Sequence, residues 1–277
     1  MRSFADKTVV ITGGAGGLGL ALAQQIGAAG ARVALLDIDA SALASAQQGL
    51  QARGVAALGL ACDVADLDAC IGAMARVREV FGPIDVLVNN AGIAHRSLFA
   101  ATMPAVIRKL MSINFDGAVH CTHAALPDIL ARRGQIIVVS SVAGFAPLIG
   151  RTGYAASKHA LHGFFDSLRS EIAPLGAQVL IVCPSFIATG IDSRALGGDG
   201  ATLTRAKPLS GKPAQPLEIA SAICQAACIE RDLLLPGMAS KISWWLSRLA
   251  PRRYARIMAQ RLGSEFDSGQ SGGSRSA

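Results

Sequence analysis

Short apolar runs alternate with segments of helical periodicity along most of the chain. The run at 8–11 is followed by Leu18, Leu22 and Ile26, which are spaced as on one face of a helix that ends at Gly30. Further apolar runs predict strands at 33–37, 85–88, 135–139, 179–183 and 233–235, with helices near 104–132 and 152–173. Alternating strands and helices form a parallel sheet covered on both faces, so the pattern predicts a single α/β domain over residues 1–240.

A glycine-rich turn joins the first predicted strand to the first predicted helix. Gly13 permits a tight turn, Gly17 and Leu18 place backbone N–H groups where a pyrophosphate can bind, and Gly19 lets helix and strand pack closely. A strand, a glycine-rich turn, a helix and a second strand that ends in an acid form half of a dinucleotide-binding site. The sequence therefore predicts a Rossmann-like doubly wound parallel sheet.

The acid at the end of the second strand bears on the choice of cofactor. Asp37 lies eighteen residues after Gly19, where a carboxylate accepts hydrogen bonds from the adenosine ribose hydroxyls and repels a 2′-phosphate. Neither neighbour offers a phosphate partner, because no basic residue precedes Gly17 and Ile38 follows Asp37. We therefore expect NAD(H), with NADP(H) less favoured; the alternative is that Asp37 is only a solvated strand end.

A tyrosine and a lysine four residues apart suggest a proton-transfer site. On a helix this spacing puts Tyr154 and Lys158 on one face, with the ammonium beside the phenol. A free tyrosine ionises near pH ~10, and a neighbouring cation lowers that value toward the working range of a base. Ser141, thirteen positions upstream, is placed to hold a substrate oxygen. The alternative is a tyrosine and a solvated lysine on an ordinary helix surface.

Several spaced motifs together resemble the short-chain dehydrogenase/reductase family, from about Lys7 to 235. The turn from Thr12 to Gly19 resembles the family's cofactor loop. Ser141, Tyr154 and Lys158 match its catalytic serine, tyrosine and lysine at the expected mutual spacing. The other matching positions are Asp63 and Val64 at the adenine contact, Asn90, Ala91 and Gly92 beside the cofactor, and the catalytic asparagine Asn114.

The resemblance implies a role for each catalytic residue. Tyr154 is expected to act as general acid or base, and Ser141 to orient the substrate oxygen. Lys158 is expected to lower the pKa of Tyr154 and to hydrogen-bond the nicotinamide ribose, while Asn114 holds a water for proton release. For Asn114 the alternative is a buried amide that caps local backbone, and for Asp63 it is a turn or cap residue.

The chain departs from the family pattern at two places. Pro184 is followed by serine where the family usually has glycine, although Pro184, Ile187 and Thr189 still match cofactor positions, Thr189 that of the carboxamide contact. The second departure is a long C-terminal extension, predicted to be a basic amphipathic segment at 241–263 followed by a disordered, Ser- and Gly-rich tail at 264–277.

Positive charge is concentrated in this extension. Residues 231–263 carry seven Lys and Arg against one acid, a net of +6, whereas residues 1–230 carry only +2. Ile242, Trp245, Leu246 and Leu249 have helical spacing. Packing on the chain's own domain or on a second subunit is slightly favoured; the alternatives are peripheral membrane contact through 241–262 and a lid over an apolar pocket. Because the charge is local, no nucleic-acid partner is expected.

Composition indicates a folded cytoplasmic protein, because 51% of residues are hydrophobic, 16% are charged, and neither a signal peptide nor a membrane span is evident. The six cysteines include no Cys-x-x-Cys pair and are expected to be buried free thiols. His120 with His123, and His159 with His162, lack supporting ligands, so no metal is expected.

Substrate class follows from the segments expected to form the pocket, which are mostly apolar. These residues are Ile93, Leu98, Phe99, Phe145, Leu148, Ile149, Phe186 and Ile187. We therefore predict a lipophilic secondary alcohol or ketone of steroid-, retinoid- or long-chain-like character. The alternatives are a reductase of 3-oxoacyl thioesters and a non-catalytic NAD-sensing scaffold. The helices containing Asn114 and Tyr154 resemble those that pair subunits in the family, which implies a homodimer or homotetramer.

Overall fold

The structure is a computed structural model that describes residues 3–191, 193–203 and 213–263. The tail predicted at 264–277 lies outside the described residues. Seven parallel strands form one sheet in the order β3-β2-β1-β4-β5-β6-β7. Their bounds are β1 Thr8–Thr12, β2 Arg32–Asp37, β3 Ala57–Ala61, β4 Val86–Asn89, β5 Gln135–Val139, β6 Gln178–Val182 and β7 Leu233–Leu234.

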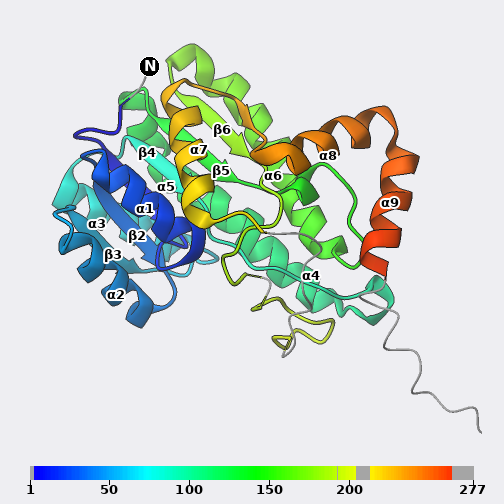
Figure 1. The fold of residues 1–277 in the computed structure, drawn as a ribbon. Helices are drawn as coiled ribbons and strands as arrows, with labels where there is room; N and C mark the ends of the chain where they lie inside the picture. The colour runs from blue at the N-terminus through cyan, green and yellow to red at the C-terminus, as the bar shows by residue number, and fades with distance from the viewer. Residues whose placement is uncertain (1–2, 192, 204–212, 264–277) are drawn as a thin grey trace, which may run out of the picture.

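Helices cover both faces of this sheet (Figure 1). One face packs against α1 Gly17–Ala28, α2 Ala40–Gln51 and α7 Pro216–Cys228. The other face packs against α3 Leu67–Phe81, α5 Gly117–Ala131 and α6 Thr152–Ile172. The α/β doubly wound fold predicted from the alternation of elements is therefore confirmed. The strand order reverses between β1 and β4, and in this architecture ligands bind beyond the carboxyl ends of the strands at such a point.

The helix predicted near 104–132 is not continuous. It consists of α4 Pro104–Met111, a π-helical segment Ser112–Asp116 and α5. Short single-turn helices precede and follow other elements, at Phe99–Ala101, Val142–Gly144 (η3) and Ala173–Leu175. The π-helical segment contains Asn114, so the break falls at a predicted site residue, and π-bulges are frequent at functional sites.

The C-terminal extension forms two helices that lie beside α6 and away from α1 to α3 (Figure 1). They are α8 Gly237–Leu249 and α9 Pro251–Gly263, separated by the helix-breaking Pro251. The predicted division at residue 240 thus falls inside α8. Tyr254 of α9 packs with Val142 and Ala146 beside η3, and Leu246 contributes to this cluster. None of the described helices combines the length and the apolar character needed to cross a membrane.

A buried carboxylate joins the amino ends of the central strands. Asp85, just before β4, accepts hydrogen bonds from the Thr8 amide (3.0 Å), Arg132 Nε (3.0 Å) and Lys7 Nζ (3.3 Å). Burial alone would raise the pKa of Asp85, but the Thr8 amide, Arg132 and Lys7 outweigh it, so the pKa lies below its ordinary 3.8. The carboxylate form therefore stabilises the fold.

We expect Asp85→Asn to lower the free energy of unfolding by about 1–3 kcal/mol near neutral pH, because charge-assisted hydrogen bonds are lost. Since the folded-state pKa is depressed, the wild-type contribution is present above the ordinary carboxyl pKa and is lost as pH falls through the folded value. Urea unfolding near neutral pH and near pH ~3 should show the difference shrinking in acid. The exposed Glu79→Gln, which removes a surface pair with Arg76, is the control and should change stability by under ~0.5 kcal/mol. If the difference in unfolding free energy between wild type and Asp85→Asn stayed constant with pH, the depressed pKa of Asp85 would be contradicted.

Candidate active site

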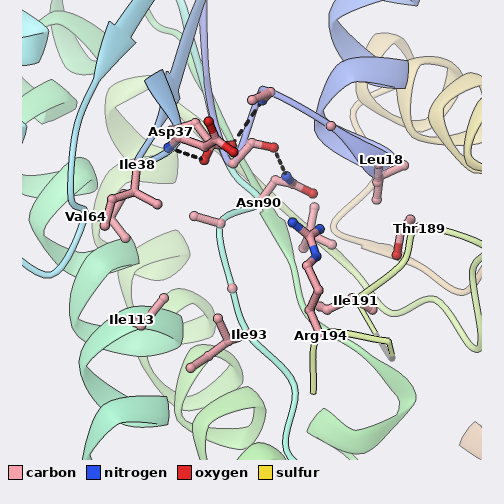
Figure 2. A pocket seen from close by; sticks show the side chains of 18 of the residues that line it. Leu18, Asp37, Ile38, Val64, Asn90, Ile93, Ile113, Thr189, Ile191 and Arg194 are labelled. Carbon is pink, nitrogen blue, oxygen red and sulfur yellow. Dashed lines mark hydrogen bonds between the residues drawn. The ribbon is translucent and has the colours of Figure 1, made fainter. Parts of the chain in front are cut away.

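A pocket of about 400 Å³ opens beyond the carboxyl ends of the strands. The glycine-rich turn after β1, the end of β2 and the segments after β3, β4 and β6 line it, together with Lys158 of α6. Figure 2 shows that Asp37, Ile38 and Val64 lie at one end, whereas Ile93 and Ile113 lie at the other. The pocket lining therefore includes residues of both the predicted nucleotide end and the predicted chemical end.

The glycine-rich turn has the geometry that its sequence predicts. Gly13 and Gly17 have φ values of 61° and 55°, a region that favours glycine. A Cβ at Gly19 would lie 2.1 Å from the carbonyl oxygen of Gly13, so Gly19 allows α1 to approach the turn. Gly19 does not itself line the pocket. Helix α1 begins with no side-chain cap and its first residues, Gly17 and Leu18, line the pocket, so its unpaired N–H groups are available to an anion.

Polar contacts fix this turn to the segment after β4. The Thr12 hydroxyl accepts hydrogen bonds from the amides of Asn90 (3.0 Å) and Ala91 (2.9 Å). In return, Asn90 Nδ2 donates to the carbonyls of Thr12 (2.9 Å) and Gly13 (3.0 Å). Asn90, Ala91 and Gly92 are thereby held on the pocket wall, where the sequence predicted them. Thr12 was not among the predicted site residues.

At the nucleotide end, hydrogen bonds hold the Asp37 side chain beside the glycine-rich turn. Its carboxylate accepts hydrogen bonds from the amides of Ala15 (3.1 Å) and Asp39 (3.2 Å). Asp63 also lines the pocket, and it accepts a hydrogen bond from the Ala65 amide (2.9 Å) as a turn residue would. Val64 presents an apolar wall nearby. A carboxylate acceptor beside apolar side chains suits an adenosine.

The loop after β6 closes the opposite side of the pocket. Thr189 faces the glycine-rich turn, since a Cβ at Gly17 would lie 3.1 Å from its Cβ. Ile187 also lines the pocket, but Pro184 does not; its carbonyl instead accepts a hydrogen bond from the Val142 amide (3.0 Å). Pro184 therefore positions η3 and does not contact the pocket directly.

Lys158 is buried at the chemical end. Its side chain reaches the Val139 carbonyl at the end of β5, with Nζ to oxygen 2.9 Å, and Nζ lies 5.8 Å from the centroid of the Tyr154 ring. The residue is only 4% exposed. Burial lowers the pKa of Lys158 to about 8, partly opposed by the Cys183 thiol. Near neutral pH the Lys158 amine is thus still protonated, and the charge of the resulting ammonium is poorly screened by water.

Asn114 links three elements around this lysine. Its Oδ1 accepts from the Ile93 amide (2.8 Å), and its Nδ2 donates to the Ile93 carbonyl (3.0 Å) and to Ser157 Oγ (2.9 Å). Ser157 Oγ in turn donates to the Tyr154 carbonyl (2.9 Å). Asn114 therefore does hold local backbone, as the alternative reading of its sequence context expected. Its role as a water ligand stays a prediction.

Ser141 lies at the start of η3, where its hydroxyl accepts a hydrogen bond from the Ala143 amide (3.1 Å). η3 packs against α6, the helix that carries Tyr154 and Lys158. Among the described residues, Asn114, Ser141 and Tyr154 do not line the 400 Å³ pocket, whereas Lys158 does. Of the four residues predicted to be catalytic, the described pocket lining therefore includes Lys158 alone.

Sequence reasoning missed several residues of the site. Ser157 and Thr12 carry the hydrogen bonds just described, and both lie within recognised motifs, but neither is predicted as a site residue. Arg194 also lines the pocket and extends from the loop after β6 toward Asn90 (Figure 2). That loop has no periodicity, so nothing in the sequence indicates where Arg194 points. The described residues contain no group of three or more His, Cys, Asp or Glu arranged to hold a metal ion.

These features together fit a dinucleotide. The turn supplies uncapped backbone N–H groups for phosphates, Asp37 supplies an acceptor at one end, and Lys158 supplies a buried cation at the other. A Cβ at Gly92 would lie 3.1 Å from Asn114 Oδ1 and 3.6 Å from Lys158 Nζ, so this glycine keeps the space before the lysine open. Fold and site define the class as dinucleotide-binding α/β enzymes with a tyrosine–lysine pair.

Comparisons with known proteins identify the family within that class. The family model for short chain dehydrogenases matches residues 7–196. The chain is 34% identical over 274 residues to Dehydrogenase/reductase SDR family member 7B of Bos taurus, covering 96% of this chain and 84% of that protein. It is 36% identical over 267 residues to Dehydrogenase/reductase SDR family protein 7-like of Anopheles gambiae, covering 94% and 84%.

A solved structure agrees with these relatives. A short-chain dehydrogenase/reductase from Burkholderia phymatum in complex with NAD is 26% identical and superposes with a TM-score of 0.80, covering 94% of this chain and 97% of that one. The chain therefore belongs to the short-chain dehydrogenase/reductase family, as its motifs predicted. This family supports an oxidoreductase that acts on CH–OH groups with a nicotinamide cofactor.

The buried ammonium of Lys158 predicts a specific pH dependence of stability. Because burial lowers its folded pKa to about 8 from 10.5, the unfolded chain binds more protons between these values, and wild-type stability gains as pH rises through them. Lys158→Met lacks this gain. The unfolding free energy of wild type relative to Lys158→Met should rise by on the order of 2 kcal/mol from about pH 7 to pH 10.

Chemical denaturation across this pH range measures the effect. Lys109→Met removes an exposed lysine of α4 and is the matched control, for which the difference from wild type should stay constant. A flat difference for Lys158→Met as well would show that burial does not destabilise the Lys158 ammonium.

Proposed function

We propose that the protein transfers a hydride between NAD(H) and a lipophilic secondary alcohol or ketone, with Tyr154 as general acid/base. The observation that carries this proposal is the buried Lys158 ammonium, which lies over the Tyr154 ring and lines the same pocket as the glycine-rich turn and Asp37. A cation in that position stabilises a phenolate, and a phenolate is the base that alcohol oxidation needs.

Each residue has a distinct task in the proposed reaction. The Tyr154 phenolate takes the alcohol proton during oxidation, and the Tyr154 hydroxyl gives that proton to the ketone oxygen during reduction. Ser141 orients that oxygen by hydrogen bonding, and Lys158 stabilises the phenolate. The glycine-rich turn, Asp37 and Thr189 hold the cofactor. When bound, the nicotinamide supplies or accepts the hydride. Asn114 and Ser157 position the backbone at Tyr154.

The preference for an apolar substrate rests on the inner pocket wall. Ile93, Phe186 and Ile187, all predicted from the sequence, line the pocket, and Ile113 and Ile191 join them. Two further predicted residues, Leu98 and Phe99, are exposed, whereas Phe145 packs edge-on against Trp244 with ring centroids 4.9 Å apart. The apolar wall is therefore smaller than the sequence suggested, but it favours carbon-rich substrates over sugars or hydroxy acids.

The preference for NAD(H) rests on Asp37. Its carboxylate borders the pocket at the end of β2, and in this fold an acid there binds the ribose hydroxyls and repels a 2′-phosphate. Ile38, which follows it, is 72% exposed and carries no charge to attract that phosphate. The structural relative from Burkholderia phymatum is described in complex with NAD, which is consistent with this choice.

Tyr154→Phe should lose turnover by at least ~10³-fold while NAD(H) binding stays within about twofold, because only the hydroxyl is removed. Nicotinamide absorbance over a panel of secondary alcohols of increasing apolar size, with NAD and with NADP, measures turnover. Tyr254→Phe is a matched control, since Tyr154 and Tyr254 are the two tyrosines of the chain and Tyr254 packs in α9. That control should retain turnover.

The same panel separates the other candidate functions. Faster turnover of 3-oxoacyl thioesters with NADPH would replace the proposal by the thioester reductase. NAD(H) binding without turnover of any substrate would favour the non-catalytic scaffold. In that case Tyr154→Phe should lose no measurable property of the wild type.

Asp37→Ala should shrink the preference for NAD(H) over NADP(H) by at least about tenfold in kcat/KM, because it removes both the ribose acceptor and the repulsion of a 2′-phosphate. The quantity to compare is the ratio of kcat/KM with NAD(H) to kcat/KM with NADP(H). The two separate kcat/KM values are less informative, since loss of the hydrogen bond from the Ala15 amide to Asp37 loosens the turn for both cofactors. The exposed Asp68→Ala in α3 is the control. An unchanged ratio would mean that Asp37 is only structural.

A further inference from the structure

Helix α8 turns four large apolar side chains to solvent and its serines to the protein. Ser240 is fully buried, and Ser243 and Ser247 are half-buried against the domain. The outward face instead carries four large apolar side chains, hereafter the α8 stripe: Met238 (68% exposed), Ile242 (56%), Trp245 (62%) and Leu249 (77%). Their spacing places them on one face of the helix. A surface helix that only packs on its own domain has the opposite arrangement.

Side-chain contacts on the inner side of α8 fix the orientation of the helix on the domain. Trp244 packs edge-on against Phe145, and the Arg248 guanidinium lies 3.1 Å from the centroid of the Trp244 ring. Leu246 joins the cluster formed by Val142 and Tyr254. These contacts hold the α8 stripe outward.

Helix α9 places positive charge next to the stripe. It buries Tyr254 and Leu262, and its exposed side carries Arg252, Arg253 and Arg256. Residues 233–263 contain six Lys and Arg and no Asp or Glu. Figure 1 shows α8 and α9 meeting at a corner of the molecule, so the apolar stripe and the arginines belong to one projecting part of it.

We propose that the α8 stripe docks on the surface of an anionic lipid bilayer, with the α9 arginines bound to lipid phosphates. An apolar helix face with a tryptophan inserts between headgroups, and basic residues beside it add electrostatic attraction. With 13 residues, α8 is about 20 Å long, which suits a helix that lies in the interface and not one that spans it.

Charge argues against a second copy of the chain as the occupant of this face. A two-fold symmetric contact places the same patch on both subunits, and residues 233–263 supply six Lys and Arg to such a contact but no acid to pair with them. An anionic bilayer offers the complementary charge over the same area. The inference is independent of the reaction proposed above, because it uses only α8 and α9.

The chain carries its own matched fluorescence probes, since its two tryptophans differ in environment: Trp244 packs against Phe145, whereas Trp245 is 62% exposed. In Trp244→Phe, Trp245 is the remaining tryptophan and faces outward; in Trp245→Phe, Trp244 remains and faces the protein. Vesicles of phosphatidylcholine with about a third phosphatidylserine should shift the Trp245 emission to shorter wavelength and leave the Trp244 emission unchanged. Pure phosphatidylcholine vesicles should have a much smaller effect.

Vesicle co-sedimentation tests the two parts of the surface separately. The double variant Ile242→Ser/Leu249→Ser should bind anionic vesicles at least about tenfold more weakly. Arg252→Gln/Arg253→Gln/Arg256→Gln should bind more weakly and lose most of the salt dependence. Leu175→Ser/Leu217→Ser removes two leucines of similar exposure (55% and 50%) outside α8 and should bind as wild type does.

Either of two outcomes would overturn the proposal. One is vesicle binding that is absent, or that the Leu175→Ser/Leu217→Ser control weakens as much as the α8 variant does. The other is a dimer, detected by sedimentation without vesicles, that Ile242→Ser/Leu249→Ser dissociates, because this would assign the α8 stripe to a second copy of the chain.

Discussion

The hydroxyl of Thr12 is the contact on which the pocket depends. It accepts hydrogen bonds from the amides of Asn90 and Ala91 and donates one to the Val88 carbonyl (3.3 Å). Its hydrogen-bonding capacity is thus fully used within a buried region. These bonds join the ends of β1 and β4, the two strands between which the sheet order reverses. The crevice at that reversal is generic to the fold, and here the Thr12 and Asn90 hydrogen bonds join the segments after β1 and β4 that line it.

The position of the Tyr154–Lys158 pair depends on a second set of contacts, between the π-helical segment and α6. The side-chain amide of Asn114 forms hydrogen bonds with the Ile93 backbone and with Ser157 Oγ. Ser157 Oγ donates a hydrogen bond to the Tyr154 carbonyl. The first turn of α6 is thereby tied to the segment after β4, which also lines the pocket. The π-helical segment between α4 and α5 contains Asn114, so the break in the regular helix falls at the residue that makes these contacts.

Much of the fold and the main site residues could be predicted because they leave local signals. Apolar runs indicated most strands, and positive φ at Gly13 and Gly17 explains why glycine occurs there. Strand β3, with the sequence Ala-Leu-Gly-Leu-Ala, was missed because it lacks β-branched residues. The π-helical break was missed because apolar periodicity continues across it. Spacing also indicated that α8 is amphipathic, but which side faces the protein depends on tertiary packing against Phe145.

The burial of Lys158 links stability to the proposed chemistry. Among the described residues no carboxylate forms a salt bridge with Lys158; its Nζ donates to the Val139 carbonyl instead. A carboxylate there would offset the desolvation of the ammonium but would also neutralise its field. Without one, the folded protein keeps a poorly solvated cation whose most favourable partner is a negative charge formed beside it. In the proposed reaction a Tyr154 phenolate would be such a charge, so the burial that disfavours folding would serve the proposed chemistry.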